Sequence, residues 1–106
     1  MRILLTTLTL ACFSALAASV ADATAGQAIY SKSCKTCHGT DGTANPAIAK
    51  MMNVEIKDLK SPEVQSMSND DLKKVITAGK GKMKPVAGLT DKQVGDVIAH
   101  VRTLKE

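Results

Sequence analysis

The sequence predicts an all-α protein, and three observations lead to this class. Apolar residues recur at spacings of three and four in the second half of the chain, as they do on one face of a helix. Residues that cap helices stand immediately before these segments, and a glycine follows one of them. No strand pattern surrounds the one cysteine-rich motif. We therefore expect short helices joined by polar loops.

The first 23 residues are typical of a signal peptide and are not expected to join the fold. Arg2 supplies a positive charge, and residues 3–16 form an apolar run without a charged residue. Small residues follow and fit the signal-peptidase rule twice, so we expect cleavage after Ala21 or Ala23. The expected domain then spans residues 24–106, and after cleavage nothing would hold it stably in a membrane.

Two other interpretations of this segment fit its residues less well. The apolar run is short for a transmembrane anchor and ends in cleavable residues. Lipidation of Cys12 would need a lipoprotein box, which Thr9-Leu10-Ala11 matches poorly. Cleavage remains the prediction, and it would remove the one cysteine that lies outside the motif.

A first helix is expected over residues 25–36, with Thr24 or Asp22 as its N-cap. Gly26 and Tyr30 share one face of this helix by their spacing. A glycine in that position indicates that another helix crosses closely. The helix would run directly into the cysteine motif.

The middle of the chain is expected to hold shorter elements. Residues 39–45 form a loop by their Gly, Asp and Asn content, and residues 47–52 are weakly helical. Ser61 followed by Pro62 predicts the start of a short helix that runs towards Met67.

Two better-defined helices follow. Ser68 caps the first of them, and Gly79 ends it. Thr90 and Gln93 form a capping box that opens the last helix. Their apolar stripes are Leu72, Val75 and Ile76 in the first helix, and Val94, Val97, Ile98, Val101 and Leu104 in the last.

The segment Cys34-Lys35-Thr36-Cys37-His38 reads C-x-x-C-H, the attachment signature of a c-type haem. The two thiols add across the two vinyl groups of haem, and their spacing lets one helical turn present both sulfurs. His38 follows at once, so its imidazole is expected to ligate the iron from one face. The motif therefore predicts one covalently attached haem c per chain.

Alternatives to this interpretation lack the residues that they need. A thioredoxin-like dithiol needs a βαβ setting, and a zinc site needs four ligands. If haem is bound, the second ring nitrogen of His38 would donate to a carbonyl group. Pro46 is a candidate for that carbonyl, although a plain turn proline explains it equally well.

Residues 80–88 form a polar, glycine-containing loop that holds one methionine, Met83. A thioether is a soft ligand that suits haem iron. Because Met83 stands on a loop and not on an apolar helical face, core packing explains it poorly. We therefore expect Met83 to be the sixth iron ligand. The less favoured alternatives are Met51, Met52, Met67 and His100.

The net charge of +4 makes the chain mildly basic. It lacks the interleaved aromatic and basic residues of a nucleic-acid surface, so no nucleic acid is expected to bind. Lysines flank the expected haem site, where they either steer an acidic partner or only keep the chain soluble. These are Lys35, Lys80, Lys82 and Lys84.

With these residues in place, the chain resembles the class I c-type cytochromes, in particular the small bacterial monohaem kind. The resemblance covers the chain after the signal peptide and rests on the haem motif, the Met83 loop and the terminal helix. It implies a cytochrome c fold, in which three to five short helices wrap around one covalently bound haem. It also implies Cys34 and Cys37 as attachment residues, with His38 and Met83 as the axial iron ligands.

Two features depart from the family. Its members commonly carry an aromatic residue in the last helix, where this chain has His100 and aliphatic neighbours. Tyr30 is then the one aromatic side chain at the expected crossing of the first and last helices. In addition, Lys84 separates Met83 from Pro85, where the family often has proline immediately.

The resemblance implies electron transfer in the periplasm by a low-spin, His/Met-ligated haem, and not catalysis. Expected partners are redox proteins with acidic docking faces, and the protein is expected to be a monomer. One alternative is a dedicated cytochrome subunit of a periplasmic oxidoreductase complex. A second alternative is a haem sensor or enzyme, which would need a labile sixth ligand.

Overall fold

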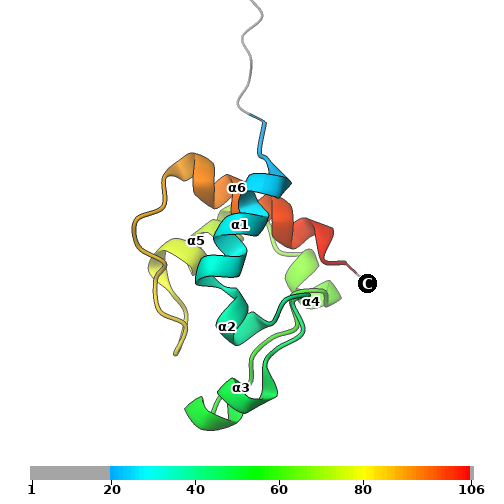
Figure 1. Cartoon of the computed structure of the whole chain (residues 1–106), viewed down its shortest axis with the longest axis vertical. Coiled ribbons are helices and arrows are strands. Elements are labelled where there is room, and N and C mark those ends of the chain that lie inside the picture. The colour runs from blue at the N-terminus through cyan, green and yellow to red at the C-terminus, as the bar shows by residue number, and fades with distance from the viewer. Residues whose placement is uncertain (1–19, 106) are drawn as a thin grey trace, which may run out of the picture.

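The computed structural model describes residues 20–105, and these residues confirm the all-α class. They contain six helical segments in place of the three to five expected, because the first expected helix is broken in two. In chain order these are α1 (Ala23–Ser33), α2 (Lys35–His38), α3 (Pro46–Met52), α4 (Pro62–Gln65), α5 (Asn69–Ala78) and α6 (Asp91–Thr103). Figure 1 shows how they are arranged.

The first expected helix, residues 25–36, does not run unbroken to the haem motif. It starts two residues earlier, where the Asp22 side chain accepts hydrogen bonds from the backbone N–H groups of Thr24 and Ala25. It ends at Cys34, whose N–H still donates to the Tyr30 carbonyl. The remaining motif residues then form the short helix α2, with Cys34 as its N-cap. The N–H of His38 donates to the Cys34 carbonyl at 3.1 Å, so one helical turn still carries both cysteines.

The other helices begin where the sequence predicts. At the start of α4, α5 and α6, a side-chain oxygen accepts a hydrogen bond from a backbone N–H of the first turn. These oxygens belong to Ser61, Ser68 and Thr90, respectively. The predicted capping box is confirmed, because Gln93 also accepts from the N–H of Thr90. Gly79 ends α5 with a φ of 77°, a left-handed conformation that favours glycine.

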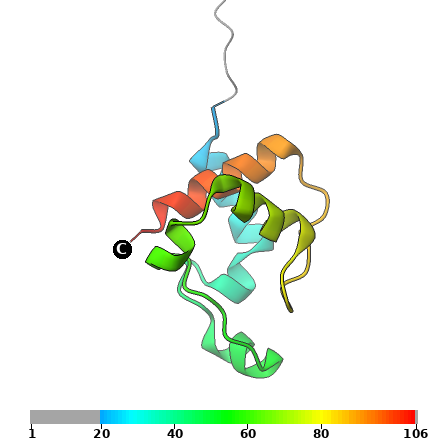
Figure 2. The ribbon, with the colours of Figure 1, turned by 180° about the vertical axis from the view of Figure 1, so that it is seen from behind.

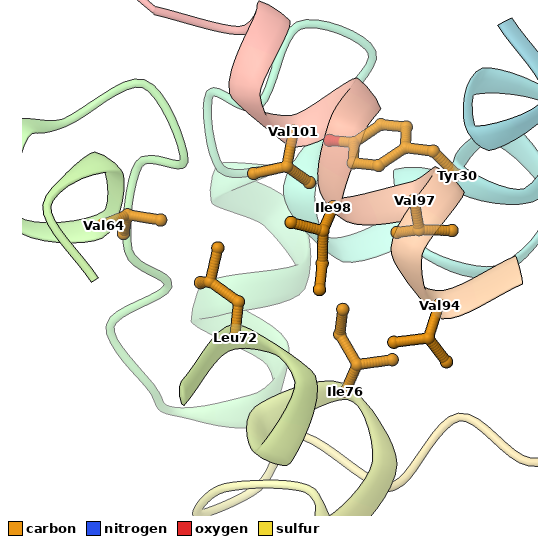
Figure 3. Packing of buried hydrophobic residues seen from close by; sticks show 8 residues of the cluster. All are labelled: Tyr30, Val64, Leu72, Ile76, Val94, Val97, Ile98 and Val101. Carbon is orange, nitrogen blue, oxygen red and sulfur yellow. The ribbon is translucent and has the colours of Figure 1, made fainter. Parts of the chain in front are cut away.

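The core forms where α1 crosses α6, with α5 packed on the other side of α6 (Figures 1 and 3). Gly26 makes this crossing possible, because a Cβ atom there would overlap the carbonyl group of Asp96. Four residues of the predicted stripe of α6 are buried, and the fifth, Leu104, is partly buried at the C-cap. The buried apolar residues are Tyr30, Val64, Leu72, Ile76, Val94, Val97, Ile98 and Val101.

The helix α3 stands apart from this core, as Figures 1 and 2 show from opposite sides. None of its residues is buried. The two chain segments that lead to and from it run side by side, and the N–H of Leu59 donates to the Gly42 carbonyl at 3.0 Å. The segment from 39 to 60 thus extends away from the core and forms one wall of the cavity described below.

The expected signal peptide lies almost wholly in residues 1–19, outside the described residues. Of the part of the chain that the structure does describe, no helix combines the length and apolar character needed to cross a membrane.

Candidate functional site

A cavity of about 810 Å³ lies between α2, the segment after α3 and the loop after α5. Its size falls within the range of about 300–1,000 Å³ that is usual for cofactor pockets. The four residues predicted from the sequence all line it: Cys34, Cys37, His38 and Met83. The fold therefore brings the haem motif and a methionine from 45 positions further along the chain to one site.

Backbone hydrogen bonds fix the helix α2 that carries Cys37 and His38. The N–H of Asn45 donates to the Cys37 carbonyl at 2.9 Å, and the Asn45 side chain donates to the Thr36 carbonyl at 3.2 Å. Gly39 follows the histidine with a φ of 77°, and a Cβ atom there would overlap the Thr43 carbonyl oxygen. The loop is thus folded back under α2, which holds the histidine at the cavity wall.

Tyr30 connects the core to this loop. Its hydroxyl donates to the carbonyl of Gly39 at 2.6 Å, and its ring is 1% exposed. Burial, followed by the nearby Cys34 and Asp41, raises the pKa of Tyr30 to about 12. The hydroxyl therefore stays protonated and remains a donor at neutral pH, so α1 holds the residue next to His38 in place.

The His38 ring offers one nitrogen to a bound group. Its Nδ1 atom is buried without a hydrogen-bond partner, and burial lowers the pKa of the ring, which favours the neutral form. A neutral imidazole is the form that ligates a metal, through one of its two ring nitrogens. No hydrogen bond joins His38 to Pro46 among the described residues, where Pro46 is the first residue of α3.

A tight turn presents Met83 to the cavity. The backbone of Lys80 and Met83 exchanges two hydrogen bonds of 3.0 Å, and the N–H of Val86 donates to the Ile76 carbonyl at 2.8 Å. Gly79 permits the turn, because a Cβ atom there would lie 2.6 Å from the Met83 carbonyl oxygen. The predicted loop position of Met83 is confirmed, and its side chain is half-buried.

The alternative ligands occupy different places. Met51 is 74% exposed, Met67 packs against the core, and His100 is buried beside Tyr30 with the two rings 4.9 Å apart. Met52, however, does line the cavity. Its carbonyl also accepts a hydrogen bond of 2.6 Å from the Lys82 ammonium, which ties the Met83 loop to the end of α3.

Sequence reasoning named Met52 only as a less favoured ligand, and it missed both the place of Met52 on the cavity wall and this Lys82 contact. Nothing in the local sequence indicates either, because the two residues are 30 positions apart and meet through the fold. Sequence reasoning also missed Asn45 as an anchor of α2. Its position just before Pro46 is the signal that could have found it, because its side chain caps α3.

The Cys34 thiol does not have the environment of a reactive redox thiol. Burial, followed by the neighbouring Cys37, raises the pKa of the Cys34 thiol. Reactive dithiols instead have thiols whose pKa is lowered by nearby positive charge. Within residues 20–105, no three His, Cys, Asp or Glu side chains gather as metal ligands. An apolar cavity with two thiols on one wall and a histidine and a methionine among its lining fits a covalently held haem.

Comparisons with known proteins agree with this arrangement. A model of the protein family described as cytochrome c oxidase, cbb3-type, subunit III, matches residues 21–101. A solved structure described as the KustC0563 c-type cytochrome matches with a TM-score of 0.66 at 27% sequence identity. That match covers 76% of this chain and 98% of the other. No curated relative matches the chain.

Proposed function

The chain belongs to the c-type cytochrome family described as cytochrome c oxidase, cbb3-type, subunit III, and we propose that it carries single electrons in the periplasm. It has the cytochrome c fold and binds haem c covalently, as the sequence predicts. Family membership also supports haem-based electron transfer. The observation that carries the finer proposal is the single cavity lined by Cys34, Cys37, His38 and Met83.

Each of these residues has a proposed role. Cys34 and Cys37 hold the haem through thioether bonds, and His38 and Met83 ligate its iron. The haem supplies a reversible change between ferric and ferrous iron. Two strong protein ligands would leave no coordination position for a substrate, so the site would exchange electrons and not make or break bonds. A methionine ligand favours the ferrous state, which raises the reduction potential relative to two histidines.

The family description favours a second candidate, in which this chain is a bound subunit of an oxidase and not a diffusible carrier. Both candidates use the same site and differ in the partner. Co-purification with oxidase subunits in a fixed ratio would support the subunit, whereas a monomeric haem protein in the soluble periplasmic fraction would support the carrier.

We expect the purified, haem-loaded protein to show a low-spin spectrum with the methionine–iron charge-transfer band in the ferric state. Intact mass should show one haem per chain, and the ferrous protein should not bind carbon monoxide. The reduced protein should also be reoxidised when it is mixed with a periplasmic extract that contains its electron acceptor. Carbon monoxide binding by the unmodified ferrous protein would contradict the carrier and favour a sensor or enzyme.

Exposed lysines at the cavity support an acidic partner. Lys80, Lys82 and Lys84 line the cavity and are exposed, and Lys35 is exposed on α2. In the described part of the chain, Lys35, Lys80 and Lys84 form no ion pair, so their charges remain available to a partner. Such charges increase association rates when the partner carries the opposite sign.

Replacing both Lys80 and Lys84 by glutamine is expected to slow electron transfer to the partner at low salt, on the order of threefold to tenfold. The slowing should shrink as salt is added, because salt screens exposed charges. Stopped-flow rates over a salt series measure this. Lys105→Gln is the control; it removes one lysine charge, half the change of the double variant, near the C-terminus and outside the cavity lining. Equal salt dependence in all three proteins would exclude steering by this cluster.

A further inference from the structure

The backbone N–H of Asp22 contacts Asp96, the one buried acidic residue among those that the structure describes. It donates to Oδ1 of Asp96 on α6 at 2.8 Å, across 74 positions of sequence. The Asp96 side chain is 4% exposed, and its other partner is the Lys92 ammonium, 3.0 Å from Oδ2. A carboxylate so far removed from water needs its partners, because an unpaired buried charge is strongly unfavourable.

Asp22 also starts α1. Its side chain accepts from the N–H groups of Thr24 and Ala25 at 2.9 and 3.2 Å, and its carbonyl accepts from the N–H of Gly26 at 2.9 Å. The two described residues before it make no comparable contribution. Val20 is 81% exposed, and Ala21 is exposed and outside any helix. Among the residues that the structure describes, the contacts of the helical core therefore begin at Asp22.

Of the two expected cleavage positions, only one preserves these contacts. A cut after Ala23 would remove the N-cap, the first residue of α1 and the hydrogen bond to Asp96. Loss of the N-cap alone would leave backbone N–H groups of the first turn without an acceptor and destabilise α1. A cut after Ala21 keeps every contact and turns the Asp22 N–H into an ammonium group 2.8 Å from a carboxylate oxygen.

We propose that the mature protein begins at Asp22, and that its new α-ammonium forms an ion pair with Asp96 that fastens α1 to α6. A signal peptidase would hydrolyse the Ala21–Asp22 peptide bond. One water molecule is consumed, the carboxylate leaves on Ala21 and the ammonium remains on Asp22. The proposal rests on the export proposed above, and it adds the place of the cut and a structural role for the amine that the cut creates.

Two further properties of the site agree with this pairing. The hydrogen bond from Asp22, followed by Lys92, holds the pKa of Asp96 below its usual range, so the carboxylate is charged at neutral pH. The backbone carbonyl of Asp96 is also the group that Gly26 of α1 approaches most closely. The ion pair would therefore lie at the tightest point between the two helices.

N-terminal sequencing and intact mass of the haem protein from the periplasm test the cut. Asp22 as the first residue supports the proposal, and Thr24 as the first residue overturns it. A haem protein that retains residues 1–21 would overturn it by showing that export processing does not occur. That outcome is distinguishable from failure of electron transfer, because the spectrum and redox activity of the same sample are measured separately.

The variant Asp96→Asn tests the ion pair, with Asp91→Asn as the matched control in the first turn of α6. Because a carboxylate favours the ammonium form, the pair stabilises fully below the ordinary α-amine pKa of about 7.7–8.0 and weakens as the pH rises beyond it. The charged groups here are Asp22, Lys92 and Asp96.

Denaturant midpoints of the haem protein should therefore fall between about pH 7 and about pH 9.5 in the unmodified protein and in Asp91→Asn. The fall should be clearly smaller in Asp96→Asn, whose midpoint is lower at pH 7. Identical pH dependence in all three proteins would overturn the ion pair. The comparison also controls for any change at the haem at alkaline pH, because such a change would affect all three proteins equally.

Discussion

Replacing Met83 by leucine is expected to abolish the ferric methionine–iron charge-transfer band and to let the ferrous protein bind carbon monoxide. The exchange removes the sulfur and keeps the side-chain volume, so the cavity should remain filled and the fold should lose less than about 1.5 kcal/mol. The reduction potential should fall, since the axial ligand is one of the main determinants of haem potential. Optical spectra of both redox states and a redox titration measure these effects.

Met52→Leu is the matched control for this experiment. Met52 also lines the cavity. Its contact with Lys82 is made by the backbone carbonyl and not by the sulfur. The substitution leaves that carbonyl in place, so the band and the absence of carbon monoxide binding should both persist. If the band instead disappears in Met52→Leu and persists in Met83→Leu, then Met52 is the ligand and the assignment of Met83 is wrong.

The elements that could be predicted from the sequence are those that depend on local interactions. Ser68 caps α5 through a bond to Asp71 three residues away, and the capping box of α6 joins Thr90 to Gln93. The apolar stripe of α6 is likewise a property of one short segment. Such features need no knowledge of the rest of the chain, and the structure confirms them. The haem motif is equally local, because its chemistry is defined by adjacent residues.

The features that could not be predicted depend on contacts between distant residues. No proline or glycine marks the break at Cys34, so the helical pattern alone suggests continuity through the motif. In the structure, the Tyr30 hydroxyl of α1 donates to the carbonyl of Gly39, which directly follows α2, so a contact across the break links the two helices. The approach of Met52 to the Met83 loop is also non-local. It requires the segment that carries α3 to extend away from the core, and no apolar pattern in the sequence predicts this.

Gly26→Ala should be the most damaging single-methyl change in the helical core. An alanine Cβ atom would overlap the Asp96 carbonyl group and lie 2.9 Å from the Val97 nitrogen, both of which are backbone atoms of α6. Backbone atoms cannot rotate away as a flexible side chain can, so α1 and α6 would have to separate. We expect a loss of at least about 3 kcal/mol of unfolding free energy, at the upper end of overpacking effects. Denaturant unfolding of the haem protein measures it.

Gly95→Ala makes the same chemical change in the middle of α6, where no atom beyond its chain neighbours and the backbone of α6 lies within 4 Å of the added methyl group. Alanine is the better helix former by about 1 kcal/mol, so this variant should be as stable as the unmodified protein or more so. The contrast has a functional consequence, because α1 leads directly into Cys34. Gly26→Ala should also weaken the methionine–iron band, whereas Gly95→Ala should preserve it. Equal stability of the two variants would show that the close crossing of α1 and α6 is not what holds the haem-binding segment in position.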